Sequence, residues 1–366
     1  MKIVHIVPGS LYQGGVGTLT RFLCESLVVH RHEVTVYYLS KEPDHRDIKE
    51  TEKGVIVKRF NPIIGDPFYA PPHSLTEDLS KQNANIIHVH NVNTLLPAYI
   101  VTLGNQFSRA IILQPHYHRH GQNAVRNLFF SIYKKIFKTV AVQHYDVIIA
   151  NSQYERMTLQ KDFPNISSKI TLVPEEYSIT VPPHVRWKPS VHTKKVLSVG
   201  ALTKYKNVDS LIRAFKVLTL RRQDLELVIV GDGPERKRLM TLAHKLEVYD
   251  RMKLKKRLPS NELLQEYANA NVMVLLSSLE SFSRVAHEAI AVGVPLIVYN
   301  YGALSELVKK GLAKGVNTLD PVNVAYAIND AINKNWTTTR PTRTFKGEAY
   351  AALMIKVYEN LMRQVS

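Results

Sequence analysis

Two glutamates, Glu280 and Glu288, stand on either side of the start of an expected helix. An apolar run at residues 272–275 precedes them, and a helical pattern follows at 284–292 before Gly293 ends it. A helix start presents unpaired N–H groups and a positive dipole end, which together favour a phosphate or diphosphate. Carboxylates beside it could accept hydrogen bonds from sugar and ribose hydroxyl groups. The spacing therefore predicts that one site could hold both ends of a nucleotide sugar.

The same two glutamates have a simpler interpretation, which they alone leave open. Glu288 stands one helical turn after Arg284 and could merely form a salt bridge with it. Glu280 could be a solvated acid in a loop. The choice between a ligand site and a salt bridge therefore depends on the rest of the chain.

The first half of the chain alternates short apolar runs with helical patterns. A glycine-bearing loop at 14–17 stands between the first run and a helix that extends to residue 29. Strands that alternate with helices predict a parallel sheet. The expected strands are 2–7, 33–39, 86–89, 110–113 and 147–150, and a further helix is expected at 122–142.

A second series of strands and helices follows a proline-rich, basic stretch at 181–195. Its apolar runs are nearly continuous, as parallel strands buried on both faces should be. We therefore expect two α/β units in tandem, hinged near this stretch. The expected strands are 196–199, 225–230, 272–275 and 296–299, and the expected helices are 208–220, 234–245, 261–268, 284–292 and 305–310.

Composition narrows the class of protein and its partners. The chain has 48 Lys and Arg against 31 Asp and Glu, and its net charge of +17 favours anionic partners such as nucleic acid, phosphorylated substrates or an acidic membrane surface. Cys24 is the only cysteine and is expected in the core, so no intrachain disulfide can form and a reducing compartment fits. No apolar run approaches the ~18 residues needed to span a bilayer. We expect a cytoplasmic protein, peripheral on the cytoplasmic membrane face at most.

The segment 280–295 resembles the signature of family 4 glycosyltransferases, which have the glycosyltransferase B fold of two Rossmann-like domains. That signature carries two glutamates separated by seven residues. Further stretches resemble other family motifs in the family order, at 197–209, 230–234 and 301–306. Weaker resemblances in the first half lie at 14–17, 115–118 and 146–152.

The resemblance implies two Rossmann-like domains that face each other across a cleft. Residues 1–180 would form the acceptor domain, 181–345 the nucleotide-sugar domain, and 346–366 a C-terminal helix that packs back on the first domain. The implied enzyme is hexosyltransferase-like and moves a sugar from a nucleotide-diphosphate-sugar to a hydroxyl group of a glycan, glycolipid or lipid-linked intermediate. Retention of anomeric configuration is implied, and the chain carries no Asp-x-Asp motif for a metal ion.

The resemblance also assigns roles to particular residues. Glu280 would bind the sugar, and Glu288 would bind the ribose. Lys206 would bind the diphosphate, whose negative charge grows as the bond to the sugar breaks. His116 would approach the donor sugar from the opposite domain, so the implied catalytic residues are His116, Glu280 and Lys206. The implied sugar-donor contacts further include Gly15, Gly17, Gly200, Lys204, Gly231, Ser281, Phe282, Ser283, Arg284, Val285 and Glu306.

Two positions depart from the family pattern. Ala201 stands where the family places an arginine, so one expected cation for the diphosphate is missing, and Lys204 could substitute for it. Ser283 stands where the family has a glycine, which matters only if its φ is positive. Ser283 keeps the backbone N–H, so we expect the backbone contact to survive.

Two other ligands are poor fits to the sequence. His116, His118 and His120 alternate and could bind zinc, but no convincing fourth ligand stands nearby, so we expect no metal. The glycines at 14–17 do not complete a G-x-G-x-x-G pattern, because Thr20 stands where its third glycine belongs. We therefore expect no NAD and no cofactor beyond the nucleotide-sugar co-substrate.

Alternatives remain for the membrane and for the activity. The basic and aromatic segment 119–138 could lie on an anionic membrane, or it could be an ordinary helix whose aromatic residues pack on the sheet. A nucleotide-sugar 2-epimerase of the same fold is one alternative function, and a non-catalytic polyanion-binding protein is another. Nucleic acid is a poor partner because the basic residues are dispersed and no binding motif is recognisable.

Overall fold

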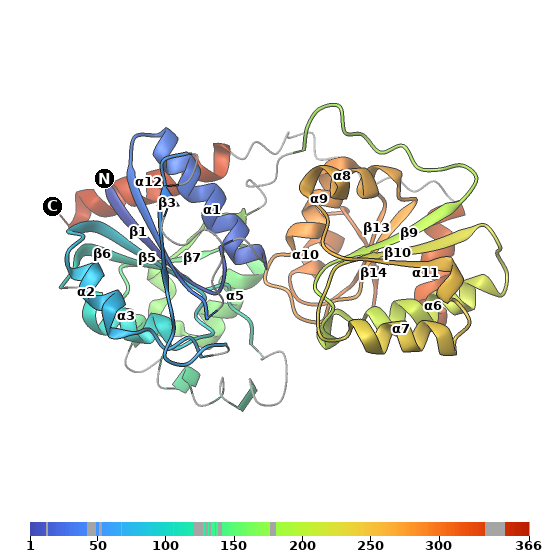
Figure 1. The fold of residues 1–366 in the computed structure, drawn as a ribbon, viewed down its shortest axis with the longest axis horizontal. Helices are drawn as coiled ribbons and strands as arrows, with labels where there is room; N and C mark the ends of the chain where they lie inside the picture. Colours follow the sequence, from blue (N-terminus) through green and yellow to red (C-terminus); the bar gives the residue numbers. More distant parts are fainter. Residues whose placement is uncertain are drawn as a thin grey trace. The chain divides into compact units, whose positions relative to one another are not determined.

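The chain folds as two compact units, as the computed structural model shows (Figure 1). The first unit comprises Met1–Ser178 and Lys346–Ser366, and the second comprises Ile179–Phe345. Each is an α/β unit built on its own sheet, so the predicted fold class is confirmed. The structure describes residues 1–11, 14–41, 49–50, 53–66, 68–104, 106–119, 127–128, 131, 133–135, 137, 141–175, 181–333 and 348–365.

The sheet of the first unit has the strand order β3-β4-β2-β1-β5-β6-β7-β8. Neighbouring strands are parallel, except that β3 runs antiparallel to β4. The strands are β1 (Lys2–Pro8), β2 (Glu33–Leu39), β3 (Lys49–Glu50), β4 (Ile56–Phe60), β5 (Ala84–His90), β6 (Ser108–Gln114), β7 (Val147–Ala150) and β8 (Ile170–Leu172).

Helices cover both faces of this first sheet. One face packs against α2 (His73–Ser80), α3 (Leu96–Gly104) and α5 (Gln153–Asp162), and the other packs against α1 (Gly14–Val29) and α12 (Glu348–Gln364). Cys24 lies fully buried between α1 and the sheet, within the second of these cores. The 3-10 helices η2 (Val142–His144) and η3 (Pro164–Lys169) flank β7 and β8. Most of the helix expected at 122–142 lies outside the described residues.

The sheet of the second unit is entirely parallel, with the order β11-β10-β9-β12-β13-β14. The chain therefore builds outward from β9 to β11 and then returns to place β12 on the other side of β9. In such doubly wound sheets, ligands bind outside the carboxyl ends of the strands at this reversal. The strands are β9 (Lys194–Val199), β10 (Leu225–Val230), β11 (Met252–Lys255), β12 (Val272–Leu275), β13 (Leu296–Tyr299) and β14 (Lys314–Val316).

The second sheet is also covered on both faces. One face packs against α6 (Val208–Thr219), α7 (Arg236–Lys245) and α11 (Pro321–Asn333), and the other against α8 (Ser260–Asn269), α9 (Arg284–Val292) and α10 (Leu304–Lys309). The short 3-10 helices are η5 (Lys204–Lys206) and η6 (Tyr249–Arg251). None of the helices in the described ranges is long and apolar enough to cross a membrane.

Candidate functional site

Glycines let two loops touch where the second sheet reverses its strand order. Gly200 follows β9 and Gly231 follows β10, and both have positive φ, at 149° and 156°. A Cβ atom on Gly231 would lie 1.9 Å from the carbonyl oxygen of Gly200, so only glycine fits there. Gly233 is confined in the same way, because its Cβ would lie 2.6 Å from the carbonyl oxygen of Leu202. The predicted residues Gly200 and Gly231 therefore form the floor of one site.

A buried ion pair joins the loops that follow β9 and β12. Lys206 Nζ donates to Glu280 Oε1, and the side chains are only 14% and 13% exposed. Burial lowers the pKa of Lys206, but the Glu280 carboxylate raises it, so the net pKa lies above its usual value. Asn207 adopts a left-handed conformation (φ 50°) and donates to the Leu276 carbonyl at 2.8 Å, which ties the two loops together. The Lys206 ammonium is therefore held charged at this edge of the sheet.

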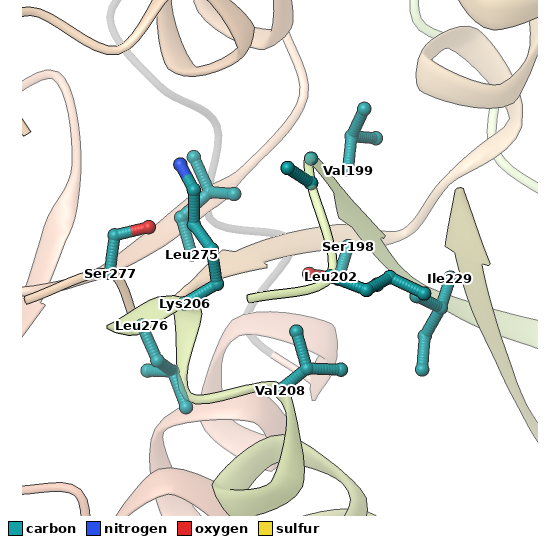
Figure 2. A pocket seen from close by; sticks show the side chains of 11 residues that line it. Ser198, Val199, Leu202, Lys206, Val208, Ile229, Leu275, Leu276 and Ser277 are labelled. Atoms are coloured by element: carbon teal, nitrogen blue, oxygen red, sulfur yellow. The ribbon is translucent and has the colours of Figure 1, made fainter. Parts of the chain in front are cut away.

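A small pocket opens beside this ion pair (Figure 2). Its walls come from the carboxyl ends of β9, β10 and β12, and the Lys206 and Ser277 side chains are among those that line it. Ala201 also lines it and brings no charge, so the cation expected from the family pattern is absent at that position. The Ser277 hydroxyl is buried and makes no hydrogen bond within the described part of the chain. The pocket therefore offers one ammonium and one unsatisfied hydroxyl.

The helix α9 begins next to this pocket with an unusual residue. Ser283 precedes the first helical residue and has φ 78° and ψ 79°, so the departure from glycine does fall at a positive φ. Its carbonyl accepts from His287 Nδ1 at 3.0 Å, and the His287 ring stacks on Phe282 with centroids 4.0 Å apart. The Ser283 hydroxyl is buried and makes no hydrogen bond to any described residue. Ser281, Arg284 and Val285 stand beside it, at or next to the start of α9.

Glu288 is bonded on both of its carboxylate oxygens. Arg284 Nε donates to Oε1 at 3.1 Å, and the hydroxyl of Tyr267 on α8 donates to Oε2 at 3.0 Å. The salt bridge of the simpler interpretation is therefore present. Burial raises the pKa of Glu288, although Arg284 and Tyr267 favour the charged form. Contact of Glu288 with a ribose stays a prediction.

The remaining predicted residues of the second unit surround the same edge. Lys204 is exposed on η5, two residues before Lys206. Glu306 lies in the first turn of α10 and is partly buried. The start of α10 reaches the ion pair, because the Ala303 N–H donates to the Glu280 carbonyl at 3.3 Å. The structure thus gathers the predicted residues of this unit at the carboxyl edge of its sheet.

The glycines of the first unit belong to α1 and not to a loop before it. The helix begins at Gly14, so the expected loop at 14–17 is wrong in its boundary. A Cβ on Gly17 would lie 2.4 Å from the Ser10 carbonyl, whereas a Cβ on Gly15 would meet nothing within 4 Å. Gly17 is therefore needed for packing, and Gly15 leaves the helix start open.

His116 lies in the first unit, just after β6. It has φ 47° and is 7% exposed. Its Nδ1 accepts from Asn151 Nδ2 at 3.2 Å, and its Nε2 makes no hydrogen bond within the described ranges. Burial, with a smaller effect of His118, lowers the pKa of His116 to about 3. The imidazole is therefore neutral at physiological pH.

The histidines that cluster in the structure are not the alternating trio of the sequence. His118 is described, but His120 lies outside the described residues. Instead, His5, His88 and His90 are fully buried and bring one ring nitrogen each within 4.8 Å of the others. The rings of His88 and His90 are stacked, with centroids 4.4 Å and planes 13° apart. Stacked rings do not point their in-plane lone pairs at a common centre, as metal ligands must.

Part of the basic, aromatic segment 119–138 lies within the described residues. Tyr133 and Phe137 are buried in the core of the first unit. Lys134 donates to the Arg119 carbonyl and lies 5.4 Å from the centre of the Tyr117 ring. These positions favour the ordinary packed interpretation. The cations Arg126 and Lys138 fall outside the described residues.

Several neighbours of the site were not foreseen from the sequence. Ser277 and Thr203 carry buried hydroxyls without a partner in the described chain, and each follows a strand by only two to four residues. Tyr267 reaches Glu288 from another helix, and no sequence signal marks it. Asn151 was noted only as part of the weak match at 146–152, which could have pointed to its contact with His116.

Comparisons with known proteins agree with this geometry. Residues 13–175 match the model of "Glycosyltransferase Family 4", and residues 185–344 match "Glycosyl transferases group 1". N-acetyl-alpha-D-glucosaminyl L-malate synthase of Bacillus anthracis is 28% identical over 77% of this chain and 69% of its own length.

Solved structures share the fold over the whole chain. Sucrose-phosphate synthase from Thermosynechococcus elongatus has a TM-score of 0.78 at 21% identity and covers 100% of both chains. HepE from Anabaena, solved in complex with UDP-glucose, has a TM-score of 0.68 at 17% identity and covers 100% of this chain and 98% of its own. The two matched models together span most of this sequence, and the chain belongs to the family 4 glycosyltransferases of the glycosyltransferase B fold.

Proposed function

We propose that the second unit binds a nucleoside diphosphate sugar and that the enzyme transfers its sugar to a hydroxyl acceptor. The observation that carries this proposal is the buried Lys206–Glu280 ion pair beside the start of α9. It places a cation and a helix N-terminus where a diphosphate would bind, and a carboxylate where a sugar would follow. The HepE complex with UDP-glucose, a protein of the same fold, supports a nucleotide-sugar donor.

In this proposal Lys206 and Glu280 serve different parts of the sugar donor. The ammonium has three N–H groups, and Glu280 accepts from one of them, so others can reach phosphate oxygens. Its charge would stabilise the diphosphate as the sugar leaves, which is worth most in a site that excludes water. Glu280 keeps acceptor capacity for a sugar hydroxyl, because a carboxylate accepts about four hydrogen bonds.

The start of α9 would complete the diphosphate site. Its first N–H groups have no partner within the helix, and the nine-residue helix directs the positive end of its dipole there. The unsatisfied hydroxyls of Ser277 and Ser283 could donate to phosphate oxygens. These donors would offset the missing cation at Ala201.

Glu288 would bind the ribose with the acceptor capacity that its two partners leave. Arg284 and Tyr267 hold the carboxylate in one orientation, so a ribose would meet a fixed acceptor. Fixing the group in advance lowers the entropy that binding must overcome. The salt bridge and the ribose contact are therefore compatible.

We further propose that transfer retains the anomeric configuration and needs no metal ion, with Lys206 and the helix start in place of a cation. His116 would donate a hydrogen bond to the transferring sugar. The acceptor would be a hydroxyl of a glycan, glycolipid or lipid-linked intermediate, at the cytoplasmic face of a membrane. Sedimentation with anionic liposomes at low salt tests the membrane part, and absence of binding would remove it.

The decisive experiment is a screen of UDP-, GDP- and ADP-sugars by calorimetry and by donor hydrolysis, with and without EDTA. We expect micromolar to millimolar binding of one class of donor, undiminished by EDTA. Strict dependence on a divalent cation would contradict the metal-free mechanism. A rearranged sugar without added acceptor would instead indicate an epimerase, and salt-sensitive DNA binding without sugar-nucleotide binding would indicate a polyanion-binding protein.

A further inference from the structure

A buried chain of amide and carboxylate groups lies behind His116 in the first unit. Gln114 ends β6 and Asn151 directly follows β7, and both side chains are fully buried. Gln114 Nε2 donates to Asn151 Oδ1, and it also donates to the hydroxyl of Tyr350 on α12 at 2.9 Å. Asn151 Nδ2 in turn donates to His116 Nδ1 at 3.2 Å. The ring of His116 is thus tied to the sheet through one defined set of bonds.

The orientation of the Asn151 amide decides whether His116 Nδ1 accepts a hydrogen bond or donates one. The Asn151 side-chain amide also lies close to the Glu155 carboxylate, which is fully buried and accepts from the Asn151 backbone N–H at 2.8 Å. A reversed amide would set its carbonyl oxygen against that carboxylate. Reversal of Gln114 as well would put its NH₂ group where its Oε1 now lies, with no partner among the described residues. The reversed arrangement would leave both N–H groups of the Gln114 amide unpaired and set an amide oxygen against a carboxylate. The observed arrangement leaves one amide oxygen and the Nε2–H of His116 unpaired, so the observed orientation is favoured.

An amide N–H can only donate, so His116 Nδ1 must offer its lone pair and the ring hydrogen must lie on Nε2. We propose that Asn151 holds His116 as the Nε2–H tautomer, so that His116 acts in sugar transfer as a hydrogen-bond donor and not as a general base. The identity of its acceptor, an oxygen of the transferring sugar, rests on the proposed function. The tautomer does not.

The surroundings of His116 agree with this assignment. Burial keeps the ring uncharged by lowering its pKa to about 3. His90 stacks on its face, with ring centroids 5.8 Å apart, and therefore does not compete for either nitrogen. His118 also acts on the ring and favours its neutral form as well. Nε2 is left buried and without a partner in the described chain, ready to donate.

Glu155 fixes the backbone on both sides of the contact. Its carboxylate accepts from the N–H of Tyr117, next to His116, and from the N–H of Asn151 at 2.8 Å. The two loops that carry the imidazole and the amide are therefore held by one side chain. Asn151 and Glu155 are positioning residues in this proposal, because neither touches the sugar.

The tautomer can be read directly in the unliganded protein. Long-range ¹H–¹⁵N spectra of histidine-labelled chain, with His116→Gln to assign the peak, should show one protonated nitrogen, Nε2, from pH 5 to 8. A proton on Nδ1, or a charged ring in that range, would overturn the proposal. This measurement needs neither substrate nor activity, so it stands apart from the test of the proposed function.

Variants connect the tautomer to catalysis. Asn151→Asp replaces the donating amide by an acceptor, so the proton should move to Nδ1, the pH at which the ring titrates should rise, and turnover should fall about 10- to 100-fold. Asn85→Asp makes the same charge change near the start of β5, at the opposite edge of the same sheet, where the side chain accepts from Lys2 N–H. It should leave the tautomer and turnover unchanged.

Substitutions of His116 itself separate a donor from a base. Gln carries an N–H near the position of Nε2, so His116→Gln should keep more activity than His116→Ala by about tenfold or more. Equal loss in both variants, with the tautomer confirmed, would refute the role in transfer and leave the tautomer standing. Unchanged turnover in Asn151→Asp despite a moved proton would overturn the hydrogen-bond donor role.

Discussion

At the scale of single residues, the Lys206–Glu280 pair can be compared with another buried ion pair. The same unit holds a second pair of similar burial, Lys195 with Glu266 at 3.0 Å, whose side chains are 18% and 12% exposed. Lys195 lies at the start of β9 and Lys206 lies beyond its end. Burial alone therefore does not distinguish them, but their positions on the sheet do.

Lys206→Met should weaken binding of the nucleoside diphosphate and slow transfer. A charge-assisted hydrogen bond contributes about 1.5–3 kcal/mol, so the dissociation constant should rise about 10- to 100-fold. Titration calorimetry at a temperature where the variant stays folded measures this change. Lys195→Met is the matched control, and we expect its affinity to match the wild type. Equal weakening in both variants would show that the loss comes from general destabilisation.

Ser283 combines a positive φ with a buried hydroxyl that has no partner among the described residues. Both features cost stability, and glycine would relieve them, so Ser283→Gly should raise the free energy of unfolding by about 1 kcal/mol. Urea unfolding measures the change. Ser210→Gly, inside α6, should instead lower stability by about 0.5–1 kcal/mol. If Ser283→Gly also weakens diphosphate binding, the hydroxyl is a ligand contact.

At the scale of elements, the start of α1 offers a paired test of packing. Gly17→Ala would put a methyl group 2.4 Å from the Ser10 carbonyl, and the overpacking should cost about 1–3 kcal/mol. Gly15→Ala meets open space in the same helix and should stabilise it by about 0.5–1 kcal/mol. Thermal unfolding of the two variants measures the difference. Similar effects of both would show that Gly17 is not confined.

Except for β4, the strands inside each sheet could be predicted, and those at the edges could not. β10, β12 and β13 begin and end where their apolar runs do, because both faces are buried. β11 was missed because lysines alternate with its apolar residues, and β14 has three residues at the edge of the sheet. Edge strands lack the continuous apolar signal on which the prediction depends.

The candidate site was predictable as a motif but not as a set of contacts. The start of α9 and its two glutamates could be read from local spacing. The Lys206–Glu280 bond joins residues 74 positions apart, and it depends on β12 returning beside β9. The His5–His90 bond likewise needs the pairing of β1 with β5. The positive φ of Ser283 is a backbone property that no spacing reveals.

At the scale of the whole molecule, the buried histidines are distributed unevenly between the units. His5, His88, His90 and His116 all lie in the first unit. Burial lowers the pKa of His5 and His116 to about 3, and it places the pKa of His88 and His90 well below the usual value. As pH falls, these histidines therefore bind protons in the unfolded chain before they do so in the folded one. Their contribution to the free energy of unfolding is present above about pH 6.5 and is lost as pH falls below it.

One acid in the first unit works in the opposite direction. Burial raises the pKa of Glu155 to about 7, although backbone N–H groups favour its charged form. The folded state therefore binds this proton more tightly, and the contribution is lost as pH rises from about 4.5 to 7. Between pH 4.5 and 6.5, the four histidines outweigh it. Unfolding of the first unit should take up about three protons there, which corresponds to about 4 kcal/mol per pH unit if the groups titrate independently.

Acidification from pH 6.5 to 5 should therefore destabilise the first unit much more than the second. In the second unit the raised pKa of Glu288 acts in the opposite sense, and the lowered pKa values of Asp224 and Glu266 matter only at lower pH. Hydrogen exchange followed by mass spectrometry, with peptides assigned to each unit, measures the two stabilities in one sample. His5→Gln should reduce the pH dependence of the free energy of unfolding of the first unit by about 1.4 kcal/mol per pH unit. The reason is that one proton fewer is then taken up on unfolding. Parallel loss of protection in both units would contradict this prediction. It would show that the buried histidines do not cause the destabilisation, or that the two units unfold together.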